Sequence, residues 1–354
     1  MKFLFYFSNL LFFCAILNFQ STTSAYVVGE TCGKIVDNLG SIGNAVYPWF
    51  AVLSTTNGRQ FCGGTVLTKN KILTAASCIH GKDNLYKFTA TDIIVTLGAR
   101  NLSASIERGR ITVDVERIDV HPDWNVSSMS FDADMAVLTL THDVNFNRFI
   151  KPICMTDSNS EIMKITQGHS ISYGLHSYDD NKNELNPITI PIENRNEYCF
   201  YTNYELVQFS SPRTFCGGYR NGSGVCMGDG GNGLFVIYDN MYYLRGIVSA
   251  TLVSGGGCDL FSYAIFTDVP KFYSWINSKI NDLTVQTTTI ATTTYRSKWQ
   301  QYFANQGSLE TTTRMTYRTT RRTTPTSTTT PSPEYNQNAN EDVSCASKWY
   351  RFCP

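Results

Sequence analysis

The stretch that decides the fold is Cys62-Gly-Gly-Thr-Val-Leu-Thr-Lys-Asn-Lys-Ile-Leu-Thr-Ala-Ala-Ser77-Cys78. Two further blocks follow it along the chain: Asp134-Met-Ala-Val-Leu-Thr-Leu and Cys226-Met-Gly-Asp-Gly-Gly-Asn-Gly. Short alternating or apolar runs, separated by Gly, Pro, Asn and Asp, lie at 93–97, 111–115, 136–140 and 242–248. This pattern predicts an antiparallel all-β domain over residues 35–283. Helical spacing is confined to 270–280, so we expect a single helix to close the domain.

The three blocks resemble those of the trypsin/chymotrypsin-like serine protease family. In that family the first block ends in Thr-Ala-Ala-His-Cys and the third reads Cys-Gln-Gly-Asp-Ser-Gly-Gly-Pro. Shorter matches extend the resemblance through the predicted domain, at Pro48-Trp49, His121-Pro122, Gly246-Ile-Val-Ser249 and Trp275-Ile276. The resemblance implies two six-stranded antiparallel β-barrels of the chymotrypsin type, followed by a C-terminal helix.

The resemblance also locates the catalytic positions. The family's chemistry needs an imidazole base, a carboxylate that orients it and a hydroxyl nucleophile, in the chain order His, Asp, Ser. Here these places hold Ser77, Asp134 and Gly230. A serine is no base near neutral pH, and glycine has no side chain with which to attack a substrate. We therefore expect a catalytically inactive homologue.

Three neighbouring groups could in principle replace a lost catalytic residue: His80, Ser223 and Ser249. We expect them to lie on other turns or strands, out of hydrogen-bond reach of a reacting partner. The orphaned Asp134 needs hydrogen bonds if it is buried, and we expect the Ser77 hydroxyl and a water to supply them.

The glycine-rich block implies two further features of the site. Gly228 and Gly230 would keep the backbone amides of an oxyanion hole. Gly224 falls at the floor of the specificity pocket, where trypsin-like members carry Asp. The remaining expected pocket residues are Ser249, Thr251 and Ala264. Such a pocket does not favour cationic side chains, and we expect it to be small or blocked.

Lys34-Ile35-Val36 resembles an activation site. Cleavage after Lys34 would give Ile35 a new amino group that pairs with Asp229. However, Asp37-Asn38 replaces the usual two glycines, so an uncleaved chain, in which Asp229 accepts backbone amides, stays open as the alternative.

The cysteines are expected to form disulfides. Of eleven, Cys14 lies in the signal segment, which leaves an even number. Sequence alone does not fix the disulfide pairing, because eight cysteines already allow 105 connectivities and this chain has more than eight. The family pattern implies Cys32–Cys154, Cys62–Cys78, Cys199–Cys216 and Cys226–Cys258. Cys345 and Cys353 either pair with each other or with another chain.

The two ends of the chain differ from the predicted domain. Lys2 and the apolar run to Phe19 predict a signal peptide over 1–25, followed by a propeptide-like segment at 26–34. We therefore expect a secreted protein. Three sequons, at Asn101, Asn125 and Asn221, fit an extracellular glycoprotein. Residues 284–341 are rich in Thr and Pro and resemble a glycosylated, disordered stalk, and 342–354 form a Cys-containing tail.

Charge and spacing exclude several functions. The chain of 354 residues has 29 basic and 29 acidic side chains, so it gives no sign of nucleic-acid binding. No metal-site spacing is present, and we expect no cofactor and no stable membrane insertion. Four arginines make the tail locally basic, but a solvated linker is the simpler interpretation: Arg314, Arg318, Arg321 and Arg322.

The leading hypothesis is a binding or regulatory protease homologue whose partner is an extracellular protein, such as a protease or its substrate. Loops on a rigid scaffold would carry this function. One alternative is an active endopeptidase with an unusual site. Another is a surface or matrix protein in which the Thr-rich stalk is the functional part.

Overall fold

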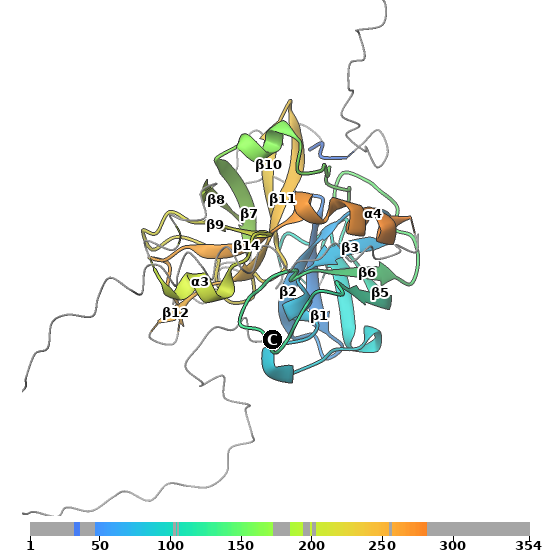
Figure 1. Cartoon of the computed structure of the whole chain (residues 1–354). Coiled ribbons are helices and arrows are strands. Elements are labelled where there is room, and N and C mark those ends of the chain that lie inside the picture. Colours follow the sequence, from blue (N-terminus) through green and yellow to red (C-terminus); the bar gives the residue numbers. More distant parts are fainter. Residues whose placement is uncertain are drawn as a thin grey trace, which may run out of the picture. The chain divides into compact units, whose positions relative to one another are not determined.

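The computed structural model describes residues 32–35, 47–101, 104, 106–172, 185–193, 199, 203–254 and 257–281. All of them belong to one compact unit. The described part contains two closed β-barrels of six strands each, so the predicted fold class is confirmed (Figure 1). No helix among the described residues has the length and apolar character needed to span a bilayer.

The first barrel is formed by β1 to β6 in the order β1-β2-β3-β6-β5-β4. Its strands are β1 (Phe50–Thr55), β2 (Gln60–Val66), β3 (Lys71–Thr74), β4 (Ile93–Leu97), β5 (Ile111–Val120) and β6 (Ala136–Leu140). All neighbouring strands in this barrel are antiparallel. β6 is buried along its whole length, whereas β5 alternates, with Val113 and Val115 facing the core.

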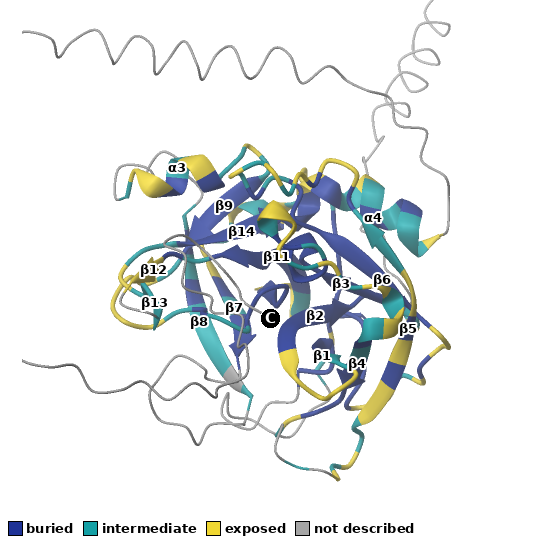
Figure 2. Cartoon of the chain, turned by 90° about the horizontal axis from the view of Figure 1, so that it is seen from below, coloured by how far each residue is buried: buried dark blue, intermediate teal, exposed yellow. Residues whose placement is uncertain are grey.

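The second barrel has the order β10-β11-β14-β9-β8-β7. Its strands are β7 (Gln167–Ser172), β8 (Asn186–Glu193), β9 (Thr214–Gly217), β10 (Gly233–Tyr238), β11 (Met241–Ala250) and β14 (Ala264–Asp268). A separate hairpin joins β12 (Val253–Ser254) and β13 (Gly257–Cys258). Figure 2 shows β11 and β14 as largely buried strands and the exposed residues mainly in turns and along β5.

The helices differ from the expectation of a single one. The predicted helix at 270–280 is divided into a 3-10 turn, η6 (Val269–Phe272), and α4 (Tyr273–Ile280). A second short helix, α3 (Glu205–Phe209), was not predicted. This helix has only five residues, of which Leu206 and Phe209 are buried. A segment of this length is too short to show a helical periodicity in the sequence. The described part also contains the 3-10 turns η2 (Ala76–Cys78), η3 (Lys82–Asn84), η4 (Ala90–Asp92) and η5 (Glu161–Lys164).

A large aromatic cluster helps to join the barrels. Trp49, just before β1, packs its ring 5.5 Å from that of Phe235 on β10 and 5.0 Å from that of Tyr242 on β11. These residues share one apolar cluster with the interior of the first barrel. Burial of this apolar surface is the main contribution that holds the two barrels against each other.

The described residues form four disulfides, and they are the four pairs that the family resemblance implied: Cys32–Cys154, Cys62–Cys78, Cys199–Cys216 and Cys226–Cys258. Two of them bear on the site, because one anchors η2 to β2 and the other anchors the glycine-rich block to β13. Such a set is typical of proteins that fold in an oxidising compartment.

Candidate functional site

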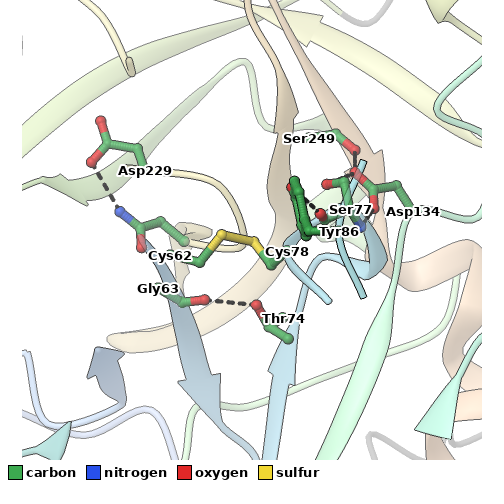
Figure 3. Close-up of a disulfide and its surroundings, with 10 residues drawn as sticks. Cys62, Gly63, Thr74, Ser77, Cys78, Tyr86, Asp134, Asp229 and Ser249 are labelled. Carbon is green, nitrogen blue, oxygen red and sulfur yellow. Dashed lines mark hydrogen bonds between the residues drawn. A yellow bond between two sulfur atoms is a disulfide. The ribbon is translucent and has the colours of Figure 1, made fainter. Parts of the chain in front are cut away.

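The first two of the three catalytic positions, Ser77 and Asp134, lie together between the barrels. Ser77 is in η2, directly after β3, and Asp134 lies two residues before β6. The Ser77 N–H donates to Asp134 Oδ1 at 2.6 Å, and the Ser77 hydroxyl donates to Asp134 Oδ2 at 2.9 Å (Figure 3). The expected contact between the serine hydroxyl and the orphaned carboxylate is therefore present.

The second barrel supplies donors that the sequence did not suggest. The hydroxyl of Ser249, on β11, donates to Asp134 Oδ2. Thr267, on β14, donates its hydroxyl to the Asp134 carbonyl at 3.1 Å and lies 3.2 Å from the Ser249 hydroxyl. Ser249 was expected in the pocket wall, but it is not among the residues that line the pocket, and its hydroxyl instead contacts Asp134. Whether it can replace a catalytic residue stays a prediction. No local signal links it to Asp134, since 115 residues separate them.

Asp134 is fully buried, and this burial raises its pKa from 3.8 to about 6. The donors Ser249 and Ser77 act in the opposite direction, because they stabilise the charged carboxylate. Three donors on two oxygens thus offset part of the desolvation cost without removing it. The carboxylate is hydrogen-bonded and remains harder to ionise than an exposed aspartate.

Lys82 brings a positive charge to the same region. Its ammonium group donates to the carbonyls of Ser130 at 2.6 Å and Asn125 at 3.0 Å, and it lies 3.8 Å from the ring centroid of Trp124. Burial lowers the pKa of Lys82 to about 8, although the charge of Asp134 acts to raise it. This lysine fixes the 124–130 loop over η3, next to the site.

The third catalytic position holds Gly230, which lies in the glycine-rich block before β10. Its carbonyl accepts from the Gly63 N–H at 2.9 Å, which holds the block against β2. Gly228 and Gly231 have φ values of +87° and +77°, whereas Gly230 does not adopt a positive φ. The backbone at Gly230 therefore does not require glycine, and a serine would be compatible with it.

Asp229 is buried beside Gly230, and burial raises its pKa to about 7. It accepts from the Cys226 N–H at 2.9 Å and from the Asn232 amide at 3.2 Å. Ile35 packs at the edge of the core, and residues 36–46 lie outside the described part. Whether the chain is cleaved after Lys34, so that Ile35 pairs with Asp229, stays a prediction.

The expected specificity pocket is nearly filled. Gly224, Thr251 and Ala264 line it, as expected, whereas Ser249 does not. Leu260 also lines it, with Cδ2 3.4 Å from the position that a Cβ on Gly224 would take. The remaining cavity is only about 10 Å³. That is about the space of one water molecule and too small for a side chain of a substrate.

Two further candidate groups lie away from Asp134. His80 lies before η3, and its Nε2 is 2.8 Å from Oδ1 of Asn84, the last residue of that turn. Ser223 is exposed at the rim of the closed pocket. Within the described ranges, no three His, Cys, Asp or Glu side chains gather as a group that could hold a metal ion.

Several predicted features lie outside the described residues. These are the signal peptide at 1–25, the segment 26–31, the stalk and tail from 284 onward, the possible Cys345–Cys353 pair, the four tail arginines and Ser103 of the first sequon. The sequon asparagines Asn125 and Asn221 are exposed, and Asn101 is half-buried.

Comparison with known proteins agrees with this geometry. The sequence profile of the family described as Trypsin matches residues 40–276. A similar curated protein is "Serine protease gd" of Drosophila melanogaster, 29% identical over 68% of this chain and 52% of its own length. Another is "Vitamin K-dependent protein C" of Oryctolagus cuniculus, 28% identical over 66% of this chain and 50% of its own length. The chain thus spans about half the length of these relatives.

Proposed function

This chain belongs to the trypsin family, and we propose that it is a secreted, proteolytically inactive member that acts by binding an extracellular protein. The partner would be a protease or the substrate of one, and the chain a regulator or cofactor in an extracellular protease cascade. The four disulfides support an oxidising compartment.

The hydrogen bond from Ser77 to Asp134 carries the proposal. In an active site of this kind, an imidazole donates to the carboxylate with one nitrogen and accepts the nucleophile's proton with the other. The Ser77 hydroxyl makes the first of these contacts, but it has no basic group for the second. Gly230 offers no hydroxyl, so there is neither a base nor a nucleophile at these positions.

The surroundings of the site support the same proposal. The specificity pocket has no room for a substrate side chain, so positioning of a scissile bond would lack its main anchor. Ser249, the other residue whose hydroxyl donates to the Asp134 carboxylate, is fully buried. A hydroxyl that is fully buried cannot reach the carbonyl carbon of a bound peptide.

The test is to treat the purified, secreted protein with a fluorophosphonate probe and with casein. The sample is assayed before and after cleavage by added trypsin-like protease, which is then removed, and active trypsin serves as the positive control. We expect no labelling and no turnover in either form. Labelling that is lost in a Ser249→Ala or Ser223→Ala variant would overturn the proposal in favour of an unusual active site.

Binding is tested separately from inactivity, by affinity capture from the native extracellular fluid. The full chain and a chain that ends at residue 283 are compared. We expect both to retain the same partner, because the folded domain carries the surface. Capture by the full chain alone would favour the stalk as the functional part. Charge reversal at Asp179 and Asp180, which lie outside the described residues, then tests whether this acidic segment contributes to binding.

A further inference from the structure

The turn at residues 220–223 joins the third sequon to the closed pocket. Its backbone is tight, with φ of +57° at Arg220 and +90° at Gly222. The Gly222 N–H donates to the Leu260 carbonyl at 3.2 Å. Since Ser223 and Leu260 both line the closed pocket, the sequon is held at the rim of that pocket.

The side chain of Asn221 is presented by this turn in a defined way. Asn221 is exposed, and its Oδ1 accepts from the Ser223 N–H at 3.2 Å. Among the residues that the structure describes, its amide nitrogen contacts no hydrogen-bond acceptor. The oxygen therefore orients the side chain, while the nitrogen that a glycosylated asparagine uses points to solvent.

An exposed aromatic ring lies beside Gly222, the residue that follows this asparagine. The Phe261 side chain is 71% exposed, and its Cζ lies 3.5 Å from the position that a Cβ on Gly222 would take. Tyr204 is 76% exposed, and its neighbour Asn203 donates to the Ser262 hydroxyl at 3.4 Å, next to Phe261. An exposed ring such as that of Phe261 leaves apolar surface in contact with water, and covering that surface is favourable.

We propose that Asn221 carries an N-linked glycan whose first sugar packs on the Phe261 ring and covers the face over the closed pocket. In the linking step, Asn221 Nδ2 bonds to the anomeric carbon of an oligosaccharide, and the bond from that carbon to a polyprenyl diphosphate breaks. Nδ2 loses one proton, and the lipid-linked oligosaccharide of the secretory pathway is the donor. The C–H face of the sugar ring removes the aromatic surface from water.

This assignment has a consequence for partner binding. A glycan is bulky and strongly hydrated, so it would keep proteins away from the face over the pocket. A protein partner would then dock on other surfaces of the two barrels. The inference requires that the chain enters the secretory pathway, but it does not depend on the loss of catalysis.

The experiment uses the full chain secreted from cultured animal cells. Ser223→Ala removes the sequon but leaves Asn221 and the backbone N–H that binds its Oδ1. Ser127→Ala is the matched control, because Asn125 Oδ1 accepts from the Ser127 N–H at 3.0 Å in the same way and its neighbour Trp124 is buried. The readouts are the intact mass and the fluorescence of a dye that binds exposed apolar surface.

We expect Ser223→Ala to lose the mass of one glycan and to gain dye fluorescence, and Phe261→Ser in the same chain to abolish that gain. Ser127→Ala should leave the dye signal unchanged, whether or not its mass falls. Three results would overturn the inference: an unchanged mass for Ser223→Ala, a lost glycan without a dye signal, or a dye signal that persists after Phe261→Ser. Since Phe261 is largely exposed, its replacement is not expected to disturb folding.

Discussion

The Asp134 carboxylate accepts three hydrogen bonds, two from Ser77 and one from Ser249. Replacing Ser249 with alanine removes one of them. The substitution deletes one oxygen from a fully buried position on β11 and leaves the Ser77 contacts in place. It therefore tests whether the second barrel stabilises the charge of Asp134. The expected cost depends on whether the carboxyl group is ionised.

A hydrogen bond to a charged group contributes about 1.5–3 kcal/mol, and one between neutral groups about 0.5–1.5 kcal/mol. With Asp134 ionised, we expect Ser249→Ala to lower the free energy of unfolding by about 2–3 kcal/mol. With Asp134 protonated, the expected loss is about 1 kcal/mol. The difference appears as a further rise in the pKa of Asp134 in the variant.

The sign of the pH dependence follows from the raised pKa. Burial raises the pKa of Asp134 in the fold from 3.8 to about 6, so between these values the folded chain holds a proton that the unfolded chain has released. The contribution of this group to stability is present below about pH 4 and is lost as the pH rises through about 6. The loss caused by Ser249→Ala should therefore be small near pH 5 and large near pH 8.

The assay is urea unfolding of wild type and variant at pH 5, 6.5 and 8. Only the difference between the two proteins is compared, because other groups also titrate in this range. For example, burial lowers the pKa of His121 to about 4. Ser170→Ala is the matched control, since this buried serine donates to the neutral Gly233 carbonyl at 3.1 Å. If Ser249→Ala costs the same at every pH, as we expect for Ser170→Ala, the reasoning about Asp134 is refuted.

Two further predictions concern activity and the framework. Restoring the catalytic residues by Ser77→His with Gly230→Ser should not give efficient cleavage of arginyl substrates, because the pocket is nearly filled and Gly224 offers no carboxylate at the position expected for its floor. A strong preference for arginine in a peptide-substrate assay would contradict this interpretation. Replacing Cys226 and Cys258 together with serine should lower the free energy of unfolding by about 2–5 kcal/mol and reduce secretion; unchanged melting and secretion would argue against a stabilising role of this bond.

The parts of the fold that could be predicted are those with a local signal. The runs at 93–97 and 136–140 coincide with β4 and β6, because short apolar runs bounded by polar residues specify buried strands. The run at 111–115 gives only the first half of β5, which continues to Val120 past a bulge between Val115 and Arg117. A bulge interrupts the alternation on which the prediction depends.

Only those parts of the site that lie in a sequence motif could be predicted. The three blocks located Ser77, Asp134 and Gly230, and the contact between the first two follows from their places in the family. The role of Ser249 arises because β11 of the second barrel passes the first barrel at Asp134. The closure of the pocket by Leu260 depends on the path of a loop. Neither contact leaves a periodic or spaced pattern in the sequence.

The donors around Asp134 explain why this carboxylate would be kept in a chain that has Ser77 where the family has its histidine. Its two oxygens accept from the Ser77 N–H and hydroxyl in the first barrel and from the Ser249 hydroxyl in the second. An asparagine at position 134 would offer only one acceptor oxygen, and its NH2 group would face the remaining donors. Buried donors without an acceptor are costly in a low-dielectric interior. Asp134 therefore links the two barrels whether or not the site catalyses anything, which is reason enough for an aspartate to be kept at this position.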